Sequence, residues 1–152
     1  MKGKYLLVSL LLVALVMGGT GYGVSAGSGD KATGGGTFIH SGSSSDYASL
    51  EDKISFGFNA QSQGNGAKGQ FHLINHDSGM KVSGTVSDYT PGYFLDATLS
   101  GTCTVDGNPR DFNVIISDWG PGTDKIDIFF GDIVWPADIS GFVTKGNIQK
   151  HK

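Results

Sequence analysis

Three aspartates surround the most turn-dense loop of the chain and could hold a metal ion. Residues 118–124 read Asp-Trp-Gly-Pro-Gly-Thr-Asp, and Asp118, Asp124 and Asp127 flank its glycines. Carboxylate oxygens on loops suit Ca²⁺, which extracellular modules hold in weak sites. The three aspartates are therefore a candidate calcium site, and calcium is the only cofactor that the sequence indicates. The alternative is that Asp118 and Asp124 cap the turn by accepting backbone N–H groups.

Aromatic side chains in predicted loops form a second candidate site. Trp119 and Trp135 lie in loops, and Tyr93 flanks the turn that contains Pro91 and Gly92. Aromatic faces stack on the apolar faces of sugars, and Asp and Asn nearby would supply hydrogen bonds. Trp119, Trp135 and Tyr93 are therefore candidate ligand-binding residues. The alternative is that at least one tryptophan plugs an end of the fold.

Patterns typical of catalysis are missing from the chain after Ala26. His72 and His76 are four residues apart on a predicted strand, which separates them by about 13 Å and is too far for one zinc ion. After Ala26, no serine lies in a Gly-x-Ser-x-Gly elbow, and no glycine loop of the chain has the Walker pattern. The many aspartates leave paired carboxylates for glycoside hydrolysis open. We expect no catalytic residues, with a secreted hydrolase as the remaining enzymatic alternative.

The N-terminus has the pattern of a secretory signal. Lys2 and Lys4 precede an uncharged apolar run of about 13 residues, and small residues then lead to Ala26. The run is shorter than the roughly 20 residues of a membrane-spanning helix. We predict a signal peptide over residues 1–26, cleavage after Ala26 and no membrane span thereafter. An uncleaved anchor is the alternative.

The composition of the remaining chain limits its partners and its compartment. The whole sequence has 11 basic and 14 acidic residues, and Lys2 and Lys4 belong to the signal, which leaves 9 basic and 14 acidic residues and a net charge of −5. An acidic domain is poorly suited to nucleic acid or to an anionic membrane. The single Cys103 excludes an internal disulfide. We expect it to be a buried apolar residue, with an intermolecular disulfide as the alternative.

Alternation of apolar and polar residues predicts strands. Residues 53–60 place Ile54, Phe56 and Phe58 on one face, and similar patterns recur at roughly ten-residue spacing. We expect residues 27–36 to be a flexible lead-in and residues 37–149 to form one glycine-rich domain. About eight antiparallel strands with short connections predict an all-β meander that closes as a barrel or a flattened sandwich.

The order of these motifs resembles the post-COAP-type domains of exported bacterial and archaeal proteins. The resemblance spans nearly all of the chain after Ala26. Its motifs are residues 34–37, 53–60, 69–73, 101–107, 118–124, Gly141 and 146–148. Trp119-Gly120 stands where the family pattern has an acidic residue, which weakens cation binding by this loop. The family carries no assigned activity, so the resemblance implies fold and export alone.

Together these features predict a secreted or cell-envelope module, structural or adhesive, that acts without catalysis. Its expected partner is a cell-envelope or extracellular protein, with a second copy of the chain as an alternative. Residues 27–36 could dock on the open sheet edge of that second copy. The second hypothesis is an extracellular barrel that binds a small ligand or a glycan, which a wide apolar cavity would favour over a filled interior.

Overall fold

The computed structural model describes residues 29–93 and 95–152, and within them the protein is all-β. Its strands are β1 (Lys31–Ile39), β2 (Lys53–Ser62), β3 (Ala67–Asn75), β4 (Lys81–Pro91), β5 (Asp96–Val105), β6 (Asn108–Ser117), β7 (Lys125–Phe130) and β8 (Ile139–His151). None of the described residues belongs to a helix that is long and apolar enough to cross a bilayer. The predicted signal peptide, residues 1–26, lies outside the described residues.

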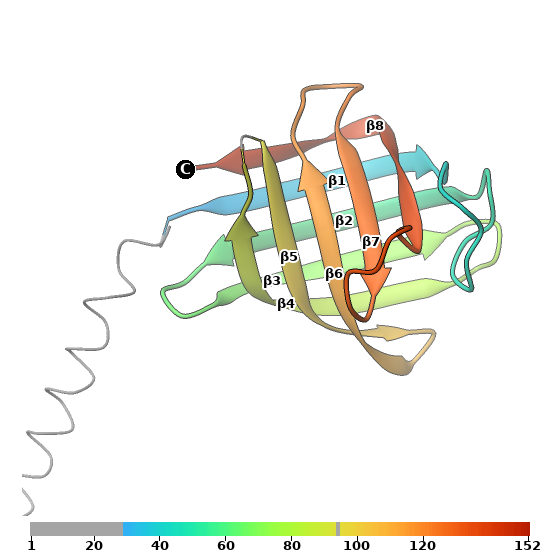
Figure 1. The fold of residues 1–152 in the computed structure, drawn as a ribbon, viewed down its shortest axis with the longest axis horizontal. Coiled ribbons are helices and arrows are strands. Elements are labelled where there is room, and N and C mark those ends of the chain that lie inside the picture. The colour runs from blue at the N-terminus through green and yellow to red at the C-terminus, as the bar shows by residue number, and fades with distance from the viewer. Residues whose placement is uncertain (1–28, 94) are drawn as a thin grey trace, which may run out of the picture.

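The eight strands close into one barrel (Figure 1). Each strand pairs antiparallel with the next, and β1 also pairs with β8, so that Lys31 lies opposite Gln61 on one side and His151 on the other. In Figure 1, β5, β6 and β7 cross steeply in front of β1, β2 and β3. The predicted eight-stranded antiparallel meander is confirmed, and it closes as a barrel.

Large apolar side chains fill the interior of the barrel. The predicted inward face of β2 is confirmed, because Ile54, Phe56 and Phe58 are at most 6% exposed. Phe71 of β3 and Phe112 of β6 stack across the interior with ring centroids 5.3 Å apart. Each fully buried side chain of this size contributes about 1.5–3 kcal/mol to folding. The interior is therefore a packed core that holds the wall in shape.

The first strand begins earlier than the sequence predicted. β1 starts at Lys31, so most of the expected lead-in over residues 27–36 is strand, and residues 27 and 28 lie outside the described part. Glycine is depleted in strands, so the glycines of this segment favoured a flexible lead-in over a strand. The structure gives a reason for one of these glycines, because a Cβ at Gly34 would overlap the ring of Phe58. The barrel spans residues 31–151 in place of the expected 37–149.

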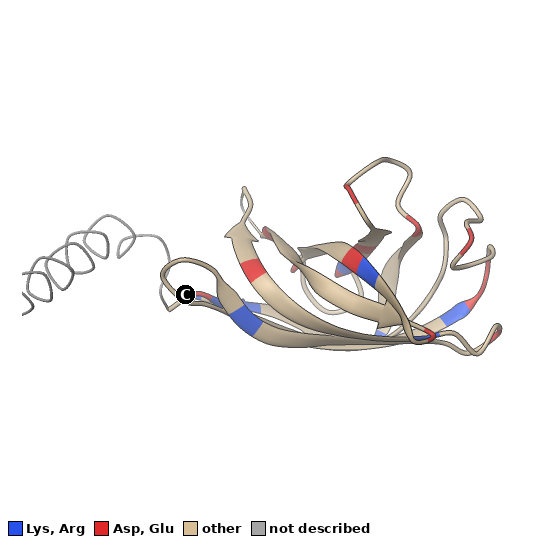
Figure 2. Ribbon diagram, turned by 90° about the horizontal axis from the view of Figure 1, so that it is seen from below, with Lys and Arg blue, Asp and Glu red and all other residues tan. Residues whose placement is uncertain are grey.

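Charged residues and Cys103 occupy contrasting places in the barrel. Figure 2 shows Asp and Glu mainly in loops and near strand ends, with long uncharged stretches of wall between them. Cys103 of β5 is 5% exposed. Burial, with a smaller effect of Asp111, raises the pKa of its thiol to about 11. The side chain is thus a buried, protonated thiol, as expected for an apolar core position.

A glycine inside a strand often marks a bulge, and Gly101 of β5 lies opposite one in β4. The register of β4 and β5 shifts between Val86 and Asp88, and Gly101 pairs with Val86 at this point. A Cβ at Gly101 would overlap the carbonyl oxygen of Thr85. The two strands approach too closely here for any side chain.

We therefore predict that Gly101→Ala lowers the free energy of unfolding by roughly 1–3 kcal/mol, because the added methyl group forces β4 and β5 apart. Gly57→Ala is the matched control, since a Cβ at Gly57 meets no atom within 4 Å. Its effect should stay within about 0.5 kcal/mol. Urea unfolding of both variants measures the difference, and equal stability would show that the close approach is wrong.

Candidate functional site

The seam between β7 and β8 is the shortest in the barrel. The two strands pair only from Lys125 opposite Phe142 to Ile128 opposite Ile139. Beyond Phe142, β8 continues to His151 with β1 on one side and the loop between β6 and β7, residues 118–124, on the other. Part of this edge of β8 therefore makes its hydrogen bonds to a loop and not to a neighbouring strand.

Two of the predicted calcium ligands bind this edge of β8. Asp124 is fully buried, and its carboxylate accepts the backbone N–H of Gly120 (2.9 Å) and of Ile148 (2.8 Å). Asp118 accepts the backbone N–H of Lys150 (2.9 Å). A buried carboxylate needs such donors, and an N–H donated to a charged acceptor makes a stronger bond than usual. The two side chains thus replace the missing part of β7.

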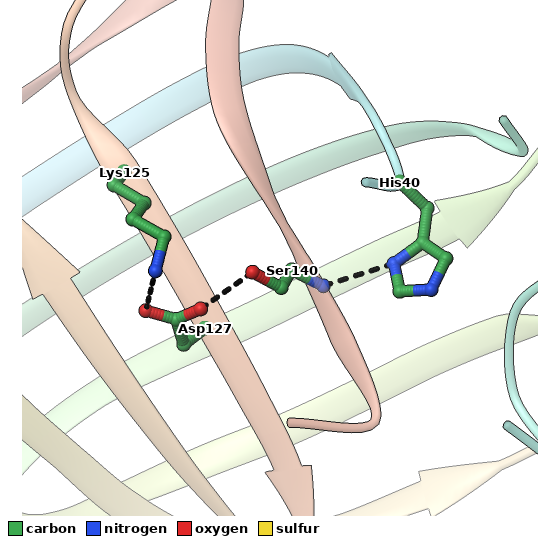
Figure 3. A network of polar contacts seen from close by, with 4 residues as sticks. All are labelled: His40, Lys125, Asp127 and Ser140. Atoms are coloured by element: carbon green, nitrogen blue, oxygen red, sulfur yellow. Dashed lines mark hydrogen bonds and ion pairs between the residues drawn. The ribbon is translucent and has the colours of Figure 1, made fainter. Parts of the chain in front are cut away.

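Asp127 has different partners on the outer side of β7. Its carboxylate accepts the hydroxyl of Ser140 (2.6 Å) and forms an ion pair with Lys125 (3.0 Å). The backbone N–H of Ser140 in turn donates to Nδ1 of His40 (3.1 Å), as Figure 3 shows. Nε2 of His40 lies 3.0 Å from the carbonyl oxygen of Ser43, so Nε2 carries the proton. This network joins β7, β8 and the segment after β1.

The network has the residue types of a catalytic triad without its geometry. In a triad the imidazole accepts the proton of the serine hydroxyl. Here the Ser140 hydroxyl donates to Asp127, and His40 bonds the Ser140 backbone instead. Both nitrogens of His40 are occupied, and its side chain is fully buried. The arrangement acts as a structural link at the short seam.

The three aspartates are not gathered around one point. Asp124 makes the turn-capping bond to Gly120, Asp118 reaches β8, and Asp127 belongs to the outer network. In residues 29–93 and 95–152, no group of three or more His, Cys, Asp or Glu side chains is placed to hold a metal ion. Calcium binding by these aspartates stays a prediction from the sequence.

The two tryptophans lie on one outer surface, together with a third aromatic residue. Trp119 contacts Phe142 of β8, with ring centroids 6.5 Å apart. Phe142 pairs with Lys125 across the seam, and Nζ of Lys125 lies 6.0 Å from the ring centre of Trp135. Trp119, Phe142 and Trp135 are 49%, 49% and 59% exposed. We call these three residues, with Lys125 between them, the aromatic strip.

Each end of the aromatic strip is held in place by neighbouring groups. The ring of Trp135 meets the ring of Phe129 edge to face, with centroids 5.0 Å apart. Phe129 is buried but stands outside the interior core cluster, because it faces outward beneath the β7–β8 loop. At the other end, the Thr123 hydroxyl bonds the carbonyl oxygen of Trp119. The rings are therefore presented in fixed positions.

Tyr93 stands apart from this surface. It lies in the loop between β4 and β5 and is 91% exposed. Within the described part of the chain, no ring contact joins it to Trp119 or Trp135. Sequence reasoning missed Phe142, although alternation along 139–143 would have placed it on the outer face with Ser140. It also missed Lys125 and His40, and the Ser140 partner of His40 is 100 residues away in the sequence.

The hollows found in the described part of the molecule lie outside the packed core. One cleft of about 360 Å³ at an end of the barrel is lined by Tyr47, Asp52, Asp106 and Arg110, among others. Hydrogen bonds from Asn75 and from the backbone of Ser49 lower the pKa of Asp52. The carboxylate of Asp52 is thus committed to holding the loop that borders this cleft.

Comparison with known proteins gives no relative: the chain matches no family model, no curated protein and no solved structure. The resemblance to post-COAP-type domains stays a prediction from the motifs.

We predict that Asp124→Asn lowers the free energy of unfolding by about 1–3 kcal/mol. The amide keeps one acceptor oxygen, so either Gly120 or Ile148 loses the partner of its buried N–H. Asp46→Asn is the control, because the Asp46 carboxylate is exposed and makes no hydrogen bond to the described residues. Chemical denaturation in a chelator measures both variants. Wild-type stability of Asp124→Asn would contradict the role of this carboxylate in the seam.

Proposed function

We propose that the protein is a secreted or cell-envelope module that binds its partner without catalysis, on the outer face of its barrel. The observation that carries the proposal is the aromatic strip. Trp, Tyr and Phe are enriched at binding surfaces, where one rigid ring supplies a large contact area at low entropic cost. Three such rings, each about half exposed, lie at the β7–β8 seam, where Trp119 contacts Phe142 and Lys125 lies next to both Phe142 and Trp135.

The filled interior supports binding on the outside. Barrels that carry a small ligand inside keep a cavity for it. Here Phe38, Phe71 and Phe112 are fully buried within the core. The second hypothesis, a ligand-binding barrel, is thus supported only in the form of a site on the outer surface.

The route of self-association expected from the sequence has less support. Strand addition needs a donor segment and a sheet edge that can accept it. Residues 31–36 already pair with β2 and β8 of their own barrel. We therefore propose that the protein contacts its partner through the side chains of the aromatic strip and not by strand addition. Export rests on the pattern of residues 1–26 and belongs to the same proposal.

Binding to the surface of the producing cells tests the proposal. The protein is collected from the medium or the envelope fraction, and its sedimentation with purified envelopes is measured. Combined Trp119→Ala and Trp135→Ala substitutions should reduce the bound fraction at least tenfold, because they remove the two largest exposed rings. Phe142→Ala, which removes one half-exposed ring, should also weaken binding.

Tyr93→Ala and Leu50→Ala are the controls, since both residues are more exposed than those of the strip but lie elsewhere. Both should bind as wild type does. Thermal unfolding confirms that each variant is folded. Recovery of the protein only inside the cells, or equal binding by all variants, would overturn the proposal.

A further inference from the structure

We infer that the aromatic strip binds a neutral glycan chain, a conclusion that rests on the proposed function. A sugar ring presents C–H groups on one face and hydroxyl groups around its rim. The C–H face matches the electron-rich face of an aromatic ring. Between Phe142 and Trp135, Lys125 offers an ammonium group whose side chain is 27% exposed. The strip thus combines rings for stacking with a hydrogen-bond donor for hydroxyls.

The size of the strip fits a narrow ligand. Aromatic side chains have about 150–250 Å² of surface each, so three half-exposed rings offer on the order of 300 Å². A standard protein–protein interface buries roughly 800 Å² on each partner. The strip is too small for a stable dimer of this chain, but it can cover one face of a few linked sugars.

The charge of the strip favours a neutral glycan over an acidic one. Lys125 is its only cation, and the carboxylate of Asp127 lies 3.0 Å from Nζ and balances that charge. The chain from residue 29 onward has 9 basic and 14 acidic residues and thus a net charge of −5. A uronic acid or a sulfated polymer would be repelled by this net negative charge. The strip has no unpaired cation that would offset the repulsion.

The strip is also ordered before any ligand arrives. Phe129 supports the ring of Trp135, and the ion pair to Asp127 fixes Lys125, whose Nζ lies 6.0 Å from the centre of that ring. At the other end, Thr123 and Asp124 hold the loop that carries Trp119. Ordered rings lose little conformational entropy on binding, which raises the affinity available from a small contact area.

Tryptophan fluorescence tests this inference directly, because the chain has two tryptophans and both belong to the strip. The processed protein is titrated with hydroxyethyl cellulose, glucomannan, laminarin, dextran and chitohexaose, and acrylamide quenching is measured. At least one neutral glycan should lower the quenching constant twofold or more, since stacked sugars shield the rings. Alginate, an acidic polymer, should leave it unchanged.

Phe142→Ala keeps both reporter tryptophans and should weaken the protection at least tenfold in affinity. Leu50→Ala is the matched control and should behave as wild type. Lack of protection by every neutral glycan, equal protection by alginate or an unaffected Phe142→Ala variant would overturn the inference. If envelope binding still depends on the strip while these glycans fail, the proposed function stands and the glycan assignment alone falls.

Discussion

Closure of the barrel depends on two hydrogen bonds from the edge of β8 to aspartate side chains. β7 has only six residues, so most of β8 beyond Phe142 has no strand on that side. Asp124 accepts the N–H of Ile148, and Asp118 accepts that of Lys150. An N–H buried without a partner costs about 1–3 kcal/mol, which is a large share of the stability of a small domain. The barrel tolerates the short β7 because these carboxylates accept two of the β8 N–H groups that a longer β7 would bind.

The same short seam determines what the outside of the barrel can do. Ile126 and Ile128 of β7 point inward and belong to the core. The outward side chains of β7 support the surface above them. Asp127 neutralises Lys125, and Phe129 underlies Trp135. The loop residues Trp119 and Trp135 approach from opposite ends of β7, and Phe142 joins them from β8. Packing inside and the proposed recognition outside thus use alternate residues of one strand.

Local sequence patterns predicted much of the fold and only part of the candidate site. Alternation at Ile54, Phe56 and Phe58 and the bulge at Gly101 are local signals, and the structure has both. The glycines of β1 did not indicate a strand, and the reason for Gly34 is the ring of Phe58, which is distant in the sequence. The bonds from Asp124 to Ile148 and from Ser140 to His40 cross 24 and 100 residues, and no local pattern encodes them.

Amide hydrogen exchange measured by NMR tests the closure of the seam most directly. A hydrogen-bonded amide exchanges only when its surroundings open, so protection reports the local free energy of opening. We predict that the amide of Ile148 is protected as strongly as those of β6, which has a strand on both sides. In Asp124→Asn this protection should fall sharply while that of β6 changes less. Exchange of the Ile148 amide at the rate of exposed loops in the wild-type protein would show that the bond to Asp124 does not close this seam.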